Sequence, residues 1–217
     1  MSGAAIAISV FGLLSAYLLG SIPTGFLLAK ALKGIDIREH GSGNTGATNV
    51  FRVIGKGAGV SALVTDLLKG LLAVWLMVWL VSSPLTGHAA ELEMAAAWLY
   101  MGAGLLVVIG HSKSVWLGFS GGKSAATGLG VLLALAWPVG LGVAAVFGLV
   151  LAISRTVSVG SMAAAVAAIA LMTFTHQPLA YIVLTLIGGL YVIFRHRSNI
   201  SRLLAGTEPK TFGSQRP

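Results

Sequence analysis

The stretch GSGNTGATN, residues 41–49, combines glycines with small hydroxyl and amide side chains and has no apolar periodicity. Glycine lets successive backbone N–H groups turn toward one point, which makes a binding site for an anion. Ser42, Thr45 and Asn49 add side-chain donors, and Arg52 follows with a guanidinium that can bind a phosphate through two hydrogen bonds. The stretch therefore fits a phosphate-binding loop, although Gly-rich segments with capping residues also simply connect helices.

A second polar stretch, GFSGGKS at 118–124, resembles two known loops without matching either. A Walker A loop needs a glycine six residues before its lysine, where this chain has Leu117. A G-x-S-x-G nucleophile elbow around Ser120 needs an acid and then a histidine downstream, but Glu208 is the only later acid and no histidine follows it. What remains is a turn that opens a helix and can donate to an oxyanion or a phosphate: Gly121, Gly122 and Lys123.

Four single charged or titratable residues have more than one interpretation. His111 and His196 lie at the ends of apolar segments, where a hydrogen-bonded interface residue is commoner than a catalyst. Asp66 and Lys69, three residues apart within an apolar segment, can pair on one helix face. We interpret them as a structural ion pair that supports the loops of the site, although charges inside a span are often functional. No His, Cys or carboxylate cluster has metal-ligand spacing, so we expect neither metal nor cofactor.

The elements that position these residues are membrane helices. The chain of 217 residues is 56% hydrophobic and 9% charged, with mean hydropathy +0.91, whereas soluble domains carry about 25% charged residues. We therefore expect an all-α polytopic helical bundle that forms a single integral membrane domain over residues 1–217, with a short tail from about residue 200. The first apolar run leads into further ones and is expected to be retained. Seven transmembrane helices are predicted, at 4–29, 58–82, 92–110, 124–137, 139–153, 157–175 and 179–194.

Charge gives the orientation of these helices. With seven spans, alternate loops collect every Lys and Arg outside the spans on one side, which the positive-inside rule makes cytoplasmic, with the N-terminus outside and the C-terminus cytoplasmic. The basic excess then records topology and predicts no nucleic-acid partner. The basic side holds Lys30, Lys33, Arg38, Arg52, Lys56, Lys113, Lys123, Arg155, Arg195, Arg197, Arg202, Lys210 and Arg216, and the other side holds only His88, Glu91, Glu93 and His176.

Several separated motifs, in order along nearly the whole chain, resemble the bacterial acyl-phosphate:glycerol-3-phosphate acyltransferase family. The resemblance implies seven transmembrane helices in the bacterial plasma (inner) membrane and an active site on the cytoplasmic face. It implies transfer of a fatty acyl group from acyl phosphate to the 1-hydroxyl of glycerol 3-phosphate, the first step of phospholipid synthesis. The motifs are GSIPTG (20–25), GSGNTGATNVFR (41–52), DLLKG (66–70), GH (110–111), FSGGKSAAT (119–127), SRTVSVGS (154–161) and RHRSNISRLLAGTE (195–208).

The chain departs from the commoner family pattern, GH-x-F-P…F-K-G-G-K-G, in its second glycine-rich motif. Lys113 and Ser114 stand in place of Phe-Pro, Ser120 in place of Lys, and Ser124 in place of Gly. One basic residue is lost and another gained, so the local charge geometry differs from that of the family.

On this resemblance we assign the substrates to separate sets of residues. Acyl phosphate is assigned to Ser42, Gly43, Asn44, Thr45, Gly46, Asn49, Gly121, Gly122 and Lys123. Glycerol 3-phosphate is assigned to Arg52, Ser158, His196, Asn199, Arg202 and Lys210. Ser42, Lys123 and His196 are the candidate catalytic residues, and the base is either His196 or the leaving phosphate.

Two other classes of function remain open at this point. A transporter of phosphate or an organic phosphate would also place basic residues beside Gly-rich loops, and a membrane scaffold would need no such site. The expected partners are the two small substrates and membrane lipid. The sequence is compatible with a monomer but leaves the oligomeric state, the acyl-chain preference and the source organism open.

Overall fold

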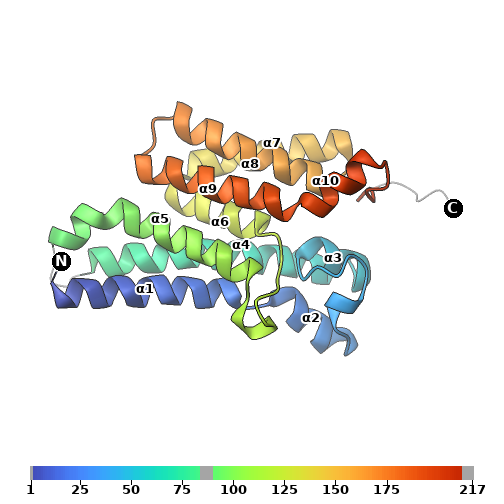
Figure 1. The fold of residues 1–217 in the computed structure, drawn as a ribbon, viewed down its shortest axis with the longest axis horizontal. Coiled ribbons are helices and arrows are strands. Elements are labelled where there is room, and N and C mark those ends of the chain that lie inside the picture. The colour runs from blue at the N-terminus through green and yellow to red at the C-terminus, as the bar shows by residue number, and fades with distance from the viewer. Residues whose placement is uncertain (1, 84–89, 212–217) are drawn as a thin grey trace. The chain divides into compact units, whose positions relative to one another are not determined.

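A computed structural model describes residues 2–83 and 90–211, and within them the regular elements are all helices (Figure 1). Their bounds are α1 (Gly3–Ser21), α2 (Thr24–Lys33), α3 (Ala47–Val53), α4 (Lys56–Ser82), α5 (Ala90–Ser112), α6 (Ala125–Leu135), α7 (Trp137–Ser154), α8 (Val157–Phe174), α9 (Leu179–Arg195) and α10 (Arg197–Leu204), with 3-10 turns η1 (Ile37–Glu39) and η3 (Val115–Leu117). The chain divides into two compact units, residues 1–135 and 136–217.

A helix lies at each predicted span, and the helices are those of a multi-pass membrane protein. By length and composition, five helical segments of the described residues can cross a bilayer, and a sixth qualifies when α9 and α10, bent by 54°, count as one. The 11-residue α6 is too short to qualify. The count of seven crossings and the single domain therefore stay predictions. Two residues used to orient the helices, His88 and Arg216, lie outside the described part of the chain.

The first predicted span, 4–29, is divided into two helices at Pro23, although residues 3–33 together still count as one candidate span. The proline ring crowds the residue before it and excludes that residue from helical geometry. Ile22 accordingly adopts φ −56° and ψ 113°, which ends α1, and α2 restarts at Thr24. The break removes the backbone carbonyl of Ile22 from the hydrogen bonds of a helix. Ile22 is one of the residues that line the candidate site.

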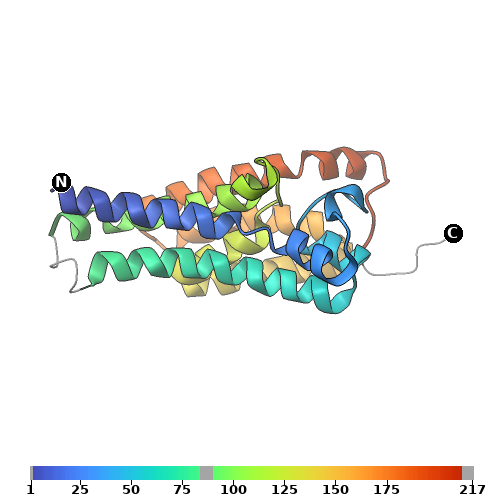
Figure 2. The ribbon, with the colours of Figure 1, turned by 90° about the horizontal axis from the view of Figure 1, so that it is seen from below.

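In the unit of residues 1–135, α1, α4 and α5 lie side by side and α6 packs on α4 (Figure 2). At one end the Ser2 N–H donates to Glu91 Oε2 at 2.6 Å, and at the other the Tyr17 hydroxyl donates to the Lys113 carbonyl at 2.8 Å. The α4–α6 crossing is so close that a Cβ at Gly130 would collide with the Leu67 carbonyl. These contacts bring the loops after α1, α2 and α5 to the same end of the unit.

In the unit of residues 136–217, α7, α8 and α9 pack in sequence order. Pro138 lies in the first turn of α7, where its missing N–H costs no hydrogen bond. The break between α6 and α7 falls at Ala136 (φ −151°), two residues before Pro138. The polar stretch predicted as a tail from about residue 200 begins within α10, and the Thr211 N–H then donates to the Arg155 carbonyl at 2.7 Å.

Candidate functional site

The first Gly-rich loop is organised by one buried side chain, Asn49 in α3. Its Nδ2 donates to the carbonyls of Ile37 (3.3 Å), His40 (3.0 Å) and Asn44 (2.9 Å). Its Oδ1 accepts from the Ser42 N–H at 2.9 Å. One carboxamide thus closes the loop from both sides, since an amide carries donors and an acceptor.

Several backbone donors that we expected to face an anion are bonded within the loop. The Gly43 N–H donates to the His40 carbonyl at 3.1 Å, and the Gly46 N–H donates to Asn44 Oδ1 at 2.8 Å. Gly43 has φ +69°, where an added Cβ would be strained and would lie 3.1 Å from the Arg38 carbonyl. The glycines therefore serve a defined turn, and a direct role of these N–H groups in phosphate binding stays a prediction.

A short ion pair fixes the entry to this loop. Arg38 donates from Nε and a terminal nitrogen to the carboxylate of Asp36, the shorter contact being 2.6 Å. The hydrogen bonds from Arg38 lower the pKa of Asp36 to about 2. Asp36 also caps η1 by accepting from the Arg38 backbone N–H, so the chain enters residues 41–49 from a rigid turn.

The second Gly-rich loop folds back on the end of α5. The Gly122 N–H donates to the His111 carbonyl at 3.1 Å. A Cβ at Gly122 would collide with the His111 ring, and a Cβ at Gly121 would collide with its carbonyl. Ser124 bonds the Ser112 hydroxyl at 2.5 Å, so the turn is tied to α5 on both sides of Lys123. The close approach to His111 explains why glycine is required at both positions.

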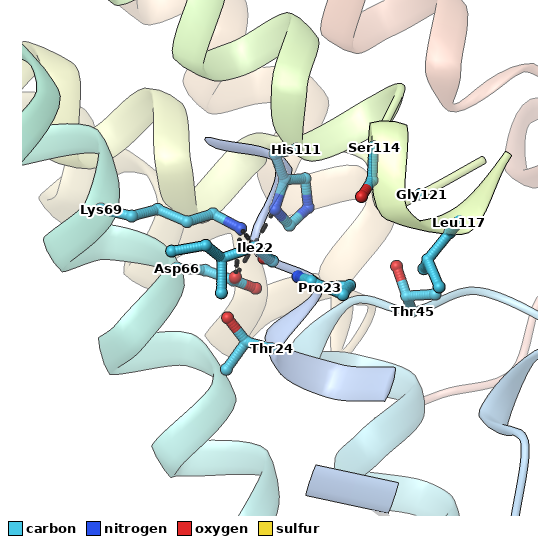
Figure 3. Close-up of a pocket in the computed structure, with 10 residues that line it drawn as sticks. All are labelled: Ile22, Pro23, Thr24, Thr45, Asp66, Lys69, His111, Ser114, Leu117 and Gly121. Atoms are coloured by element: carbon cyan, nitrogen blue, oxygen red, sulfur yellow. Dashed lines mark hydrogen bonds and ion pairs between the residues drawn. The ribbon is translucent and has the colours of Figure 1, made fainter. Parts of the chain in front are cut away.

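The two loops meet at a small pocket (Figure 3), beside which Asn44 Nδ2 donates weakly to the Gly121 carbonyl at 3.5 Å. The Thr24 hydroxyl points into the pocket from the α1–α2 break and is buried without a hydrogen-bond partner there. The lining residues are Ile22, Pro23, Thr24, Thr45, Asp66, Lys69, His111, Ser114, Leu117 and Gly121.

A buried group of charges forms one wall of this pocket. Lys69 Nζ lies 2.9 Å from Asp66 Oδ1, and His111 Nδ1 lies 3.5 Å from the same oxygen. All three side chains are at most 7% exposed. Such burial of charge inside a span is costly unless the charges are paired. The predicted pairing of Asp66 with Lys69 is confirmed, and His111 joins it.

A second cluster of predicted residues lies in the other unit and is centred on Glu208. Its carboxylate accepts from Ser158 Oγ (2.7 Å), Asn199 Nδ2 (2.5 Å) and Arg202 Nε (2.7 Å). Burial tends to raise the pKa of Glu208, but these hydrogen bonds outweigh it and lower the pKa below its usual range. The residues assigned to glycerol 3-phosphate therefore surround an ionised carboxylate that the assignment had not included.

His196 and Lys210 complete the predicted residues of this unit. The His196 ring is buried at the junction of α9 and α10, and its Nδ1 lies 2.8 Å from the Val192 carbonyl. That contact requires Nδ1 to donate, which places the lone pair of a neutral imidazole on Nε2. Lys210 is exposed, as is Arg52 in the other unit.

Comparison with known proteins identifies the family of this chain. Residues 10–206 match the family model described as glycerol-3-phosphate acyltransferase. The chain belongs to this family. A glycerol-3-phosphate acyltransferase of Nostoc sp. (strain PCC 7120 / SAG 25.82 / UTEX 2576) is 55% identical over 201 residues, covering 91% of this chain and 89% of that protein. The glycerol-3-phosphate acyltransferase 2 of Rhizobium johnstonii is 58% identical, covering 92% and 94%.

Two solved acyltransferase structures share the fold. The chain matches PlsY (YgiH), described as an integral membrane glycerol 3-phosphate acyltransferase, in its glycerol 3-phosphate form, with TM-score 0.84 and 38% identity over 94% of this chain and 96% of that one. The lysophosphatidic acid form matches with TM-score 0.82 and 37% identity, over 94% and 95%. The helical membrane architecture is thus that of the acyltransferase family.

Sequence reasoning on this acyltransferase found the loops but missed some of the residues around them. It did not place Thr24, His111 or the Asp66–Lys69 pair in the wall of a pocket, although charge inside an apolar helix was a usable signal. It also passed over Glu208, whose signal was its position as the only acid after Glu93. The substrate roles assigned from the sequence stay predictions.

Proposed function

We propose that this protein transfers a fatty acyl group from acyl phosphate to the 1-hydroxyl of glycerol 3-phosphate, giving 1-acylglycerol 3-phosphate and phosphate. Membership of the glycerol-3-phosphate acyltransferase family, together with the fold shared with PlsY, is the observation that carries acyl transfer to glycerol 3-phosphate. The donor is the finer part of the proposal. Its support is that neither Gly-rich loop contains an acidic residue while Lys123 and the nearby Arg52 add positive charge, and that the chain has no cysteine, which rules out an acyl-cysteine intermediate.

In the proposed reaction the 1-hydroxyl oxygen attacks the carbonyl carbon of the mixed anhydride. The new C–O ester bond forms, the bond from that carbon to the phosphate oxygen breaks, and phosphate leaves with the electron pair. The hydroxyl proton passes to the leaving phosphate or to His196. Because the leaving group is already good, the protein has mainly to position two anions and offset their repulsion, which preorganised donors do well.

The residues fall into two proposed binding groups. For acyl phosphate, Thr45 and Gly121 face the pocket and Lys123 follows the Gly-Gly turn, which supports this end of residues 1–135 as the phosphate site. For glycerol 3-phosphate, Ser158, Asn199 and Arg202 are hydrogen-bond donors gathered on Glu208. The residues proposed to bind acyl phosphate are Ser42, Gly43, Asn44, Thr45, Gly46, Asn49, Gly121, Gly122 and Lys123. The residues proposed to bind glycerol 3-phosphate are Arg52, Ser158, His196, Asn199, Arg202 and Lys210.

We further propose that the protein lies in the bacterial plasma membrane, with seven crossings, the N-terminus outside and the site on the cytoplasmic face. The support is that the Lys and Arg residues outside the predicted spans are confined to alternate loops.

The deciding experiment supplies the purified protein with acyl phosphate and glycerol 3-phosphate, separately and together. We expect release of inorganic phosphate only when both are present, with 1-acylglycerol 3-phosphate as product. Transfer from acyl-CoA with acyl phosphate inert would overturn the donor. Uptake of glycerol 3-phosphate into vesicles without turnover would instead indicate a transporter, which no relative described above supports.

A further inference from the structure

The buried charges of α4 lie between the two Gly-rich loops and are linked to both of them. The substrate assignments above give these charges no role. Asp66 and Lys69 are 3% and 5% exposed within a 27-residue helix that is apolar enough to cross a bilayer. An apolar pair of similar volume would avoid the cost of burying two charges. Packing alone therefore does not explain the pair, and its contacts indicate what else it does.

Lys69 reaches the first loop through the α1–α2 break. Its Nζ donates to the Ile22 carbonyl at 3.1 Å, the group that Pro23 turns out of the helix. The Thr24 N–H donates to the same carbonyl at 3.0 Å. One residue further on, the backbone of Gly25 lies so close to the Thr45 carbonyl that a Cβ would collide with it. Lys69 thus fixes the surface on which residues 41–49 rest.

Asp66 reaches the second loop through His111. The His111 Nδ1 lies 3.5 Å from Asp66 Oδ1. The opposite edge of the ring, with Nε2, lies against Gly122, and the His111 carbonyl accepts the Gly122 N–H. A tilt of the ring would therefore displace the turn that presents Lys123. Figure 3 shows Lys69 and His111 converging on Asp66 from different helices.

We propose that Asp66, Lys69 and His111 are positioning residues that hold the two Gly-rich loops in register, so that both loops bind the phosphate of one acyl phosphate molecule. The inference rests on the proposed function. Lys69 and Asp66 act as one unit on α4, with Lys69 setting the first loop and Asp66 setting the second. Loss of either contact changes no residue of the loops but lets the two loops move relative to each other.

The test compares Asp66→Asn, Lys69→Met and the double variant with wild type. The double variant removes both charges together and leaves neither buried alone, so it keeps the test open if a single variant fails to fold. Glu93→Gln, a carboxylate-to-amide change at an exposed position in the first turn of α5, is the matched control. Monodispersity in detergent and thermal midpoint establish folding, and steady-state kinetics give KM for each substrate and kcat.

We expect each folded variant to raise KM for acyl phosphate by about tenfold, the effect of one lost hydrogen bond to a charged group, while KM for glycerol 3-phosphate changes less than twofold. The control should match wild type. Unchanged KM for acyl phosphate in the folded double variant would overturn the inference. So would an effect confined to Lys69→Met, because Lys69 would then bind the phosphate directly.

His111 provides a separate readout. Asparagine places an amide nitrogen near the position of Nδ1, whereas glutamine extends toward Nε2 and loses the geometry facing Asp66. We expect His111→Asn to retain a lower KM for acyl phosphate than His111→Gln or His111→Leu. A fall in kcat at unchanged KM, equal in all three variants, would make His111 catalytic and overturn the positioning role. Failure of wild type to use acyl phosphate would instead refute the proposed donor, independently of the variants.

Discussion

At the scale of single residues, some side chains of the predicted site hold other groups of the protein in position through hydrogen bonds. Asn49 illustrates this, because its amide satisfies three carbonyls and one N–H of the first Gly-rich loop. Its conformation is set by the fold before any ligand binds. Donors held in this way can stabilise developing charge without reorganising, which is the condition for electrostatic catalysis.

Replacement of Asn49 by Asp tests this role. The change removes the Nδ2 donor and adds a negative charge, so three carbonyls lose their partner at about 1 kcal/mol each and an anionic substrate is repelled. We expect kcat/KM to fall by about 100-fold, measured by phosphate release. Gln177→Glu, the same amide-to-acid change in the turn before α9, should leave activity within twofold. Equal kinetics for the two variants would contradict an organising role.

Arg52 bears on the substrate assignment at the same scale. Arg52→Lys keeps the positive charge but loses the planar fork that binds a phosphate through two hydrogen bonds. We expect KM for glycerol 3-phosphate to rise about tenfold with a smaller change in kcat, as determined by varying this substrate at saturating acyl phosphate. A lysine variant that behaves as wild type would show that only the charge of Arg52 matters.

At the scale of elements, close helix crossings hold the loops in place. The α4–α6 crossing requires a hydrogen atom at Gly130, because a methyl would meet the Leu67 carbonyl. We expect Gly130→Ala to destabilise the protein by about 1–3 kcal/mol through overpacking. On the same helix Gly128 has open space, so Gly128→Ala should be neutral or stabilising by up to about 1 kcal/mol. The thermal midpoints of the two variants are compared in the same detergent. Equal midpoints would contradict a close α4–α6 contact at Gly130.

The segment after α9 depends on the ionised carboxylate of Glu208. Its pKa lies below the usual 4.5 in the folded protein, so its contribution to stability is present above pH 4.5 and is lost as pH falls through the lowered value. We expect Glu208→Gln to have a lower thermal midpoint than wild type at neutral pH. The difference should shrink as pH is lowered below about 4.5. A difference that stays constant with pH would show that the charge of Glu208 does not matter.

At the scale of the whole molecule, the topology depends on α6. Its 11 residues rise only about 16 Å, roughly half of the hydrocarbon thickness. If α6 crosses the membrane, the starts of α5 and of the C-terminal tail lie on opposite sides; if it does not, they lie on the same side.

Site-directed labelling tests this directly, and the lack of native cysteine removes any background. Ala90→Cys and Gly206→Cys, both at exposed positions, should react with an impermeant maleimide from opposite sides of the membrane. Labelling of both from one side would refute the seven-span topology. The prediction follows from the positive-inside distribution of Lys and Arg.

The sequence by itself determined the features that arise from local composition. Apolar runs located the membrane helices, because exclusion from water acts on each run separately. The Gly-rich loops and their motif residues were also visible, since glycine and small polar residues interrupt helices locally. The break at Pro23 belongs to this class, because the restriction on Ile22 is a property of the dipeptide; the length of the apolar run concealed it.

The tertiary structure decided which of these local features meet. No local pattern places His111 against Asp66 or Gly122, because these contacts depend on how α4, α5 and the following turn pack. The same holds for Glu208, whose partners come from α8 and α10. Hydrogen bonds and ion pairs act over a few ångströms, so their partners are fixed only once distant helices are brought into register.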